Sequence, residues 1–420
     1  MNKSPLADFR LLLYLFIGLR LTLAVVYQPY NFELYEEDGT PTLAERGLTS
    51  FGDYRYFYRL AEMTSEGDLP YRDFWYEFPP VWPLLFTGLY ALAGADYASW
   101  ATLLGLVLVV FDVGNLLLLR RLGRRLHGEA VGDALPWFYA LLAAPVVFPW
   151  WNFEPLVLFL LLLAVWWLLE GRALHSAAAT ALGVLTKFLG VLLLPTVWRF
   201  YDRRLALRYT VLVVLVVALV LGALVAWGGR MAVASLLAQF NKASYQSVWA
   251  LLDGNLRTGR FVSPGERFVT DTAYEPVGND AVLPGWLRLI PFAALGLFIY
   301  TRRLRRDDQG ILAFFSVTVV LFFLWSQGWS PQWALTLSPL ILLNFPDRVG
   351  VLLCLLIAFG SFVEYPALFA RTAASEGEIT GTLLPSFALI VVMRTLVLAG
   401  LAAALYQRLT GQEEAQLEPT

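Results

Sequence analysis

Cysteine and histidine are almost missing from this chain of 420 residues, which has one cysteine, Cys354, and two histidines, His127 and His175. A single cysteine cannot form an intrachain disulfide. The clusters of Cys and His that bind zinc are also missing. From these absences we expect no metal and no cofactor.

Charge is scarce as well. Charged residues make up 15% of the chain and the net charge is −2, so a nucleic-acid partner is not expected. Hydrophobic residues make up 58%, and the mean hydropathy is +0.61. This composition is typical of a polytopic membrane protein surrounded by membrane lipids. The first apolar run has no small-residue cleavage site after it, so we interpret it as a retained helix rather than a signal peptide.

Apolar runs follow one another along the chain, separated by charges, prolines and glycines. They predict an all-α polytopic membrane protein with about 12 transmembrane helices, each spanning or nearly spanning a core of ~30 Å. We expect one membrane domain, 1–406, followed by a polar cytoplasmic tail, 407–420. The helices are expected at 9–27, 79–95, 100–119, 135–150, 154–170, 173–198, 208–227, 284–300, 310–327, 332–345, 348–364 and 384–406.

Three polar stretches interrupt the apolar pattern, at 28–78, 228–283 and 365–383. The first is about fifty residues long, although a short turn would be enough to connect two helices. Long ordered loops often carry function. The second begins with an expected juxtamembrane helix, Met231 to Phe240. We expect 28–78 and 228–283 to form extracytoplasmic active-site loops.

Topology is predicted from the positions of lysine and arginine, which favour the cytoplasmic side. Placing 199–208, 302–306 and the C-terminus inside puts all three polar stretches outside. Simple alternation of helices then places Arg120–Arg125 outside as well, against the rule. Either that cluster is tolerated there, or segment 79–95 or segment 173–198 is re-entrant.

Asp53 lies just before an amphipathic stretch, Tyr56 to Thr64. One interpretation is a carboxylate that caps the helix N-terminus. The aromatic residues that follow it also suit a segment lying in the membrane interface. However, a carboxylate among aromatic residues at an interface can have a raised pKa and act as a general base.

Lys187 stands inside an otherwise apolar segment, with Leu185 before it and Leu189 after it. A lysine within a membrane segment is costly and indicates a functional site by default. Alternatively, its side chain snorkels to an interface. Its expected partner is a lipid phosphate or Glu154.

Other charged and aromatic residues admit structural interpretations. Asp112 and Arg394 could pair within the bundle, and Arg257, Arg260 and Arg267 could be solvated surface charges. The tryptophans between Trp325 and Trp333 suit an aromatic belt, although the glutamines among them would also suit a lining that faces a sugar.

Four groups of residues occur in an order that resembles a known family. The first runs from Asp53 through Tyr58, Tyr71, Asp73 and Glu77 to Pro79-Pro80 and Trp82-Pro83. The others are Asn152-Phe153-Glu154-Pro155 with Gly183, Lys187 and Pro195, then Tyr245-Gln246-Ser247-Val248-Trp249-Ala250, and lastly Ser330-Pro331-Gln332-Trp333 with Pro339. Together they resemble the GT-C superfamily of integral-membrane glycosyltransferases. The resemblance is closest to family 87, the polyprenyl-phosphomannose-dependent mannosyltransferases.

The resemblance implies transfer of a sugar, with mannose preferred because that family uses it, from a polyprenyl-phosphate-linked donor. The acceptor would be a hydroxyl of a glycolipid or glycan at the extracytoplasmic face of the cell membrane, and the product would have inverted stereochemistry. Asp53 would be the general base. Donor phosphate contacts are expected from Lys187, Lys242, Arg257 and Arg260, and substrate contacts from Tyr58, Tyr71, Asp73, Glu77, Gln246, Ser247 and Gln332.

One departure concerns the phosphate contact, because the family often has an arginine shortly before the Gln-Ser pair. This chain has Asn241-Lys242 there, and lysine can bind phosphate as a point charge.

Two other classes of function fit a polytopic chain. A transporter or lipid flippase predicts internal repeats and paired broken helices, and no such symmetry is visible in the sequence. A non-catalytic scaffold would not need a lysine and several carboxylates in or beside apolar helices. Glucose and arabinose would suit the expected site as well as mannose does.

Overall fold

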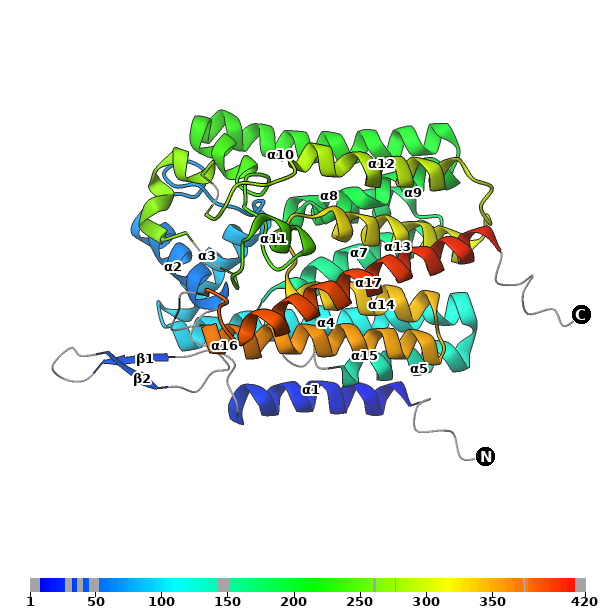
Figure 1. The fold of residues 1–420 in the computed structure, drawn as a ribbon, viewed down its shortest axis with the longest axis horizontal. Coiled ribbons are helices and arrows are strands. Elements are labelled where there is room, and N and C mark those ends of the chain that lie inside the picture. The colour runs from blue at the N-terminus through cyan, green and yellow to red at the C-terminus, as the bar shows by residue number, and fades with distance from the viewer. Residues whose placement is uncertain are drawn as a thin grey trace, which may run out of the picture.

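The computed structural model describes residues 8–26, 32–35, 41–44, 53–142, 152–259, 262–275, 277–372, 375 and 377–411. Helices dominate this part of the chain (Figure 1). The elements are α1 (Phe9–Val26), β1 (Phe32–Tyr35), β2 (Pro41–Ala44), α2 (Asp53–Glu66), α3 (Val81–Ala93), α4 (Tyr97–His127), α5 (Glu129–Leu141), α7 (Glu154–Leu169), α8 (Ala173–Lys187), η3 (Leu189–Leu193), α9 (Leu194–Phe200), α10 (Arg203–Leu237), α11 (Val248–Asp253), η4 (Pro264–Phe268), η5 (Thr270–Ala273), α12 (Gly285–Thr301), α13 (Asp308–Trp325), η6 (Pro331–Trp333), α14 (Ala334–Asn344), α15 (Arg348–Phe362), η7 (Val363–Leu368), α16 (Phe369–Thr372) and α17 (Leu383–Thr410).

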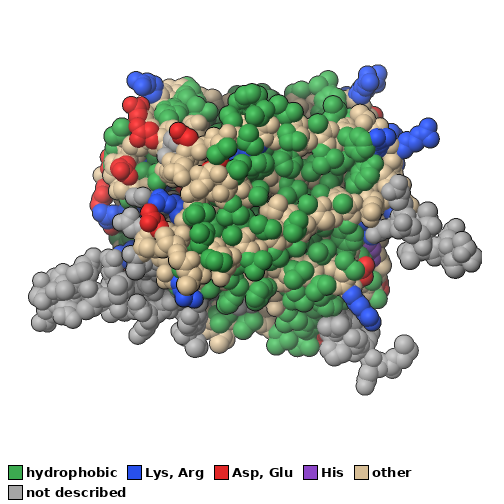
Figure 2. All heavy atoms as spheres, in the orientation of Figure 1, with side chains coloured by type: hydrophobic (Ala, Val, Ile, Leu, Met, Phe, Trp, Pro, Cys, Tyr) green, Lys and Arg blue, Asp and Glu red, His purple; other side chains and the backbone are tan. Residues whose placement is uncertain are grey.

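Five described helical segments are long and apolar enough to cross a membrane: α4, α10, α13, the run that begins with α15, and α17. Four shorter apolar segments accompany them, namely α3, α7, α12 and Leu189–Phe200. Figure 2 shows a broad apolar belt, with most of the visible charged side chains toward the two ends. The predicted all-α polytopic membrane fold is confirmed, with one small addition, the antiparallel ribbon of β1 and β2.

Arginine side chains gather at one end of the bundle. Arg125, near the end of α4, forms ion pairs of 2.6 Å with both Glu170 and Asp308. The backbone N–H of Arg305 donates to the carbonyl of Leu409 at 3.0 Å, which places the end of α17 there too. We call this the arginine-rich end. The opposite end, which carries α2, α3, α11 and α16, is the Asp53 end (Figure 1).

The conflict over Arg120–Arg125 disappears because two predicted spanning segments, 79–95 and 173–198, do not cross from one end of the bundle to the other. The first of them contains α3. Helix α3 has 13 residues, or about 20 Å, which is shorter than a bilayer core. Just beyond its end, the carbonyl of Ala95 accepts a hydrogen bond from the Tyr58 hydroxyl of α2, at 2.6 Å. Helix α3 therefore stays at the Asp53 end, and α4 carries the arginines to the other end.

The helix expected at 173–198 is not continuous, and the alternative of a re-entrant segment is the one observed. Helix α8 ends at Lys187, and Phe188 adopts a left-handed conformation with φ 59°. The chain then turns back along α8, since a Cβ on Gly190 would lie 2.5 Å from the carbonyl oxygen of Thr180. This hairpin leaves Lys187 at a helix end inside the bundle.

Two buried ion pairs correct the suggested pairing of Asp112 with Arg394. Asp112 accepts hydrogen bonds from Arg20 of α1 at 3.3 Å and from the Tyr139 hydroxyl at 2.7 Å. Arg394 instead pairs with Glu364 and donates to the backbone carbonyl of Gln246. Each arginine therefore compensates a carboxylate on another helix, as a buried charge requires.

Candidate functional site: a charged cluster around Asp53

Helix α2 places Asp53 at its first position. The helix is amphipathic and buries an apolar face that includes Phe57, whose ring lies 5.4 Å from both Phe86 and Phe153. This aromatic packing fixes α2 against α3 and the start of α7. Asp53 itself is half-buried at the beginning of the helix. Within the described residues its carboxylate forms no ion pair.

Two lysine–carboxylate pairs come from separate segments. Lys242 Nζ lies 2.7 Å from Glu77 Oε2, and Lys187 Nζ lies 2.5 Å from Glu154 Oε2. Glu154 is fully buried and also accepts a hydrogen bond from the Thr336 hydroxyl at 3.2 Å. Lys187 therefore pairs with Glu154, one of the two partners expected from the sequence.

Arg267 is a third cation of the cluster, and its interpretation as solvated surface charge is wrong. Its side chain is 1% exposed and lies 3.7 Å from Glu77 Oε1. The guanidinium also donates to the Tyr56 hydroxyl and to the carbonyl of Trp75, and lies 4.1 Å from the centre of the Trp75 ring. Arg267 therefore ties the 262–275 segment to the loop that carries Glu77.

The electrostatics of Asp53 show that these groups act on one another. Burial, followed by the negative charge of Glu77, raises the pKa of Asp53 to about 7, from an ordinary value of 3.8. Lys187 and Lys242 oppose this rise, and Glu154 adds to it. Burial alone would raise the pKa of Glu77, but the charges of Lys242 and Arg267 outweigh burial and lower it. One carboxyl is therefore poised near neutral pH beside a carboxylate that stays ionised.

Uncompensated polar groups lie among the same residues. The Tyr76 hydroxyl, Asn152 Nδ2 and Trp333 Nε1 are buried without hydrogen-bond partners in the described part of the chain. Asn152 is fully buried, and its Oδ1 accepts from the backbone N–H of Glu154 at 2.8 Å. The Trp333 ring centre lies 5.9 Å from Lys187 Nζ. Such groups can hydrogen-bond the hydroxyls of a polar ligand.

The cluster contains three cations and three carboxylates. Nowhere in the described ranges do three His, Cys, Asp or Glu side chains form a group that could bind a metal ion. The arrangement can accept a proton at Asp53 near neutral pH and can donate hydrogen bonds from Lys187, Lys242 and Arg267 to an anion.

The structure brings together four of the predicted site residues, Asp53, Glu77, Lys187 and Lys242. The three other residues predicted in the first loop have different partners. The Tyr58 ring packs on Tyr90, the Tyr71 hydroxyl donates to the carbonyl of Phe78, and Asp73 pairs with the adjacent Arg72. These contacts shape the loop and leave their polar groups engaged away from Asp53.

Ser247 and Arg257 have partners elsewhere, whereas the Gln246 Nε2 atom is buried without a hydrogen-bond partner in the described part of the chain. Ser247 caps α11 and donates to the carbonyl of Gln327 at 2.7 Å, and Gln246 is buried with its carbonyl bonded to Arg394. Arg257 forms an exposed pair with Glu378 at 3.2 Å. Gln332 lies in η6 beside Trp333. The prediction for Arg260 falls outside the described residues.

Arg267, Glu154 and Asn152 were not among the predicted site residues. Glu154 and Asn152 belong to the Asn152-Phe153-Glu154-Pro155 motif, so a signal for both was present in the sequence. Arg267 had no such signal, because its partner Glu77 lies far away along the chain.

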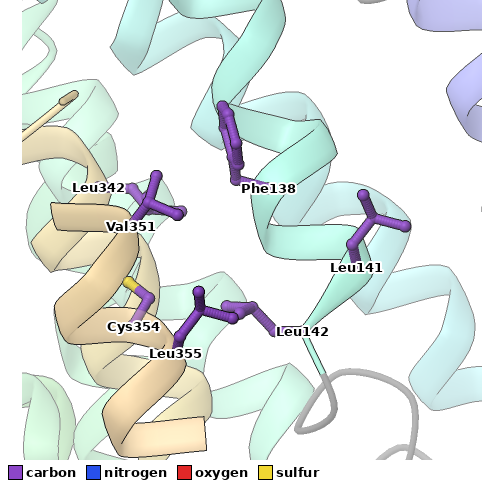
Figure 3. Close-up of a pocket in the computed structure, with 7 residues that line it drawn as sticks. All are labelled: Phe138, Leu141, Leu142, Leu342, Val351, Cys354 and Leu355. Atoms are coloured by element: carbon purple, nitrogen blue, oxygen red, sulfur yellow. The ribbon is translucent and has the colours of Figure 1, made fainter. Parts of the chain in front are cut away.

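A separate cavity lies between α5 and the pair α14 and α15 (Figure 3). Its lining is apolar apart from the Cys354 thiol, which donates to the carbonyl of Ser338. None of its lining residues belongs to the charged cluster. The residues are Phe138, Leu141, Leu142, Leu342, Val351, Cys354 and Leu355.

No protein-family model matches the chain, and no curated protein matches it. Among solved structures, the chain is similar to ArnT from Cupriavidus metallidurans, crystallised with bound undecaprenyl phosphate. The sequence identity is 15%, the TM-score is 0.44, and the match covers 96% of this chain and 78% of ArnT. At that TM-score we draw no functional argument from the similarity.

Proposed function

We propose that the protein is a GT-C-type glycosyltransferase that moves a sugar from a polyprenyl-phosphate donor to a hydroxyl acceptor, with Asp53 as general base. The observation that carries the proposal is the geometry of the cluster, in which Asp53 begins α2 among the ion pairs of Lys187, Lys242 and Arg267. In this environment burial and the charge of Glu77 raise the pKa of Asp53 to about 7. The order of motifs from Asp53 to Pro339 supports the same class of enzyme.

The reaction is a direct displacement. Asp53 accepts the proton of the acceptor hydroxyl while the acceptor oxygen bonds to the anomeric carbon of the sugar. The bond between that carbon and the phosphate oxygen breaks, and the polyprenyl phosphate leaves with the electron pair. Because the attack is opposite the leaving group, the anomeric configuration inverts.

The leaving phosphate needs positive charge close to it. Lys187 and Lys242 are already oriented by Glu154 and Glu77, and Arg267 is fixed by stacking on Trp75. Cations that are positioned before the reaction lose little freedom when the phosphate binds. We assign the donor phosphate to Lys187, Lys242 and Arg267.

The proposal includes a location. Arginines favour the cytoplasmic side, so the arginine-rich end faces the cytoplasm of a cell membrane and the Asp53 end faces outward. A single domain, 1–406, then carries extracytoplasmic loops at 28–78 and 228–283, and 407–420 forms a cytoplasmic tail. The donor reaches the site from the outer leaflet, and the acceptor is a glycolipid or glycan.

The proposal is tested by incubating the purified protein with radiolabelled polyprenyl-phosphate mannose, glucose or arabinose and an acceptor extract. We expect one donor, most simply mannose, to label a new product whose anomeric configuration is opposite to that of the donor. Retained configuration would contradict direct displacement. No transfer and no binding of any of the three donors would favour a transporter or flippase instead.

A further inference from the structure

Arg288 is a buried arginine that forms no ion pair with the described residues and whose Nε and Nη1 atoms have no hydrogen bond to them. It lies in the first turn of α12 and is 4% exposed. A buried guanidinium without compensation is costly, so a group outside the protein is expected to compensate it.

The guanidinium lies over the N-terminus of α12. The backbone N–H groups of Leu287 and Arg288 donate to the carbonyl of Pro284, at 2.9 Å and 3.1 Å, while no side chain caps the helix. The N–H groups of Gly285 and Trp286 are therefore available to a ligand. Arg288 Nη2 lies 3.8 Å from where a Cβ on Gly285 would be, so the side chain folds back toward these groups. A helix N-terminus with an adjacent cation favours an anion.

The surroundings place this anion at a membrane surface. The Trp249 ring of α11 lies 5.1 Å from the Arg288 guanidinium, and Trp325 Nε1 donates to the carbonyl of Gly285 at 3.1 Å. Trp286 is 69% exposed and Ile290 is 54% exposed, one turn further into α12. Tryptophan followed by exposed aliphatic residues is typical of the boundary between headgroups and hydrocarbon.

The carboxylate that acts on Arg288 through space is Asp253, and its oxygens are already engaged. One accepts from the Ser244 hydroxyl at 2.6 Å and the other from the backbone N–H of Val282 at 2.8 Å. Asp253 therefore moderates the positive charge without neutralising it by direct contact.

We propose that the first turn of α12 binds the phosphate group of a membrane lipid. The phosphate oxygens accept from the Arg288 guanidinium and from the N–H groups of Gly285 and Trp286, and the acyl or prenyl chain lies along the exposed apolar side of α12. This site does not depend on the proposed transferase activity. It would attach α11 and the adjoining loop to the lipid surface.

The test is lipid binding by native mass spectrometry of the delipidated, full-length protein. Phosphatidylglycerol, polyprenyl phosphate and phosphate-free diacylglycerol are titrated separately against the wild type, Arg288→Gln and Arg230→Gln. Arg230 is the matched control, because it is an exposed arginine near the same end of the bundle. We expect the wild type to bind a phosphate-bearing lipid about tenfold or more tightly than diacylglycerol.

Arg288→Gln should lose this preference, and Arg230→Gln should keep it. If binding of both phosphate lipids depends on Arg288, the site is a general headgroup site. If only binding of polyprenyl phosphate depends on Arg288, the site is specific for that lipid. Equal binding of diacylglycerol, or an unchanged preference in Arg288→Gln, would overturn the proposal.

Thermal unfolding in detergent checks the same site independently of mass spectrometry. Without lipid, Arg288→Met should be at least as stable as the wild type, because it removes a buried, uncompensated charge. Added phosphatidylglycerol or polyprenyl phosphate should raise the melting temperature of the wild type more than that of Arg288→Met. If each lipid raised the melting temperature of Arg288→Met as much as that of the wild type, the proposal would be contradicted.

Discussion

Asp53 combines a position at a helix start with an environment that keeps it partly protonated near neutral pH. Its burial and the nearby charge of Glu77 are the main reasons. The capping interpretation and the general-base interpretation begin from the same placement. They differ in the effect of ionisation on the stability of the fold. Ionising a carboxyl that only capped the helix N-terminus would stabilise the folded state.

The raised pKa predicts that Asp53 destabilises the folded state when it is ionised. Its pKa is 3.8 ordinarily and about 7 in the fold, so the folded state binds the proton more tightly. The penalty is absent below the lower value, grows between the two, and is complete above about 7. Asp53→Asn should therefore have a higher melting temperature than the wild type at pH 8, with the difference shrinking at pH 5.

The control for this measurement is Glu66→Gln, which removes an exposed carboxylate from the other end of the same helix. It should leave the melting temperature nearly unchanged at both pH values. A difference for Asp53→Asn that grew at low pH would mean that the Asp53 carboxylate is stabilised in the fold.

Arg267 is predicted to contribute strongly to stability as well as to charge. Replacing it with Gln leaves Glu77 with one fewer cation and removes the stacking on Trp75, and breaking a buried pair costs about 3–5 kcal/mol. Arg257→Gln, which removes an exposed pair with Glu378, should cost less than about 1 kcal/mol. Denaturant or thermal unfolding of both variants in the same detergent measures the difference. Equal losses would show that Arg267 is not part of a buried network.

At the scale of elements, the hairpin of α8 and η3 positions Lys187. A Cβ at position 190 would lie 2.5 Å from the carbonyl oxygen of Thr180, whereas one at position 183 would have its nearest neighbour at 3.5 Å. Gly190→Ala should thus cost about 1–3 kcal/mol through overpacking. Gly183→Ala should be neutral or stabilising, because alanine favours a helix interior over glycine by about 1 kcal/mol.

Unfolding measurements on the two alanine variants test the hairpin. If Gly190→Ala were as stable as Gly183→Ala, the close approach of η3 to α8 would be wrong. In that case Lys187 would lie in a continuous helix, as hydropathy alone suggested.

The apolar segments could be predicted from the sequence because hydropathy is a local property. The helix expected at 154–170 is observed as Glu154–Leu169, and that expected at 284–300 as Gly285–Thr301. A re-entrant segment 173–198 was one of the alternatives that the arginine positions left open, but the position of its turn could not be predicted, because no glycine or proline stands at Phe188 itself. The expected helix end at 227 corresponds to a kink in α10 at Gly229 rather than to an end, and the expected helix from Met231 continues beyond it.

The charged cluster was predictable to the extent that lone charges near apolar segments stand out. Asp53 and Lys187 could be identified this way, whereas Arg267 lies in a polar loop where arginines are ordinary. Glu77, Lys242, Tyr58 and Asp73 came from the resemblance. The partners of Tyr58 and Asp73, namely Ala95 and Arg72, depend on turns whose geometry the sequence does not reveal.

At the scale of the whole molecule, charge separates the two ends of the bundle. The arginine-rich end includes Arg125, Arg305 and the end of α17, and the Asp53 end includes α2 and α11. Since Cys354 is the single cysteine of the chain and is buried, a Cys354→Ala background allows cysteines to be introduced one at a time.

Thiol labelling tests the orientation that the proposed function requires. Ser65→Cys, exposed near the end of α2, should react with a membrane-impermeant reagent on intact cells. Arg303→Cys, exposed at the arginine-rich end, should react only after the cells are permeabilised. The reverse pattern would place the Asp53 cluster in the cytoplasm and rule out a donor from the outer leaflet.

The central claim is that Asp53 removes the acceptor proton, and the rate of sugar transfer as a function of pH tests it most directly. For the wild type, kcat/KM should rise with pH through about 7 and then level off, because the base must be deprotonated. Asp53→Asn should lower the rate by about 10²–10⁴-fold and remove this rise, while Glu66→Gln should preserve both. Transfer by Asp53→Asn at the wild-type rate, with the same pH dependence, would contradict the claim.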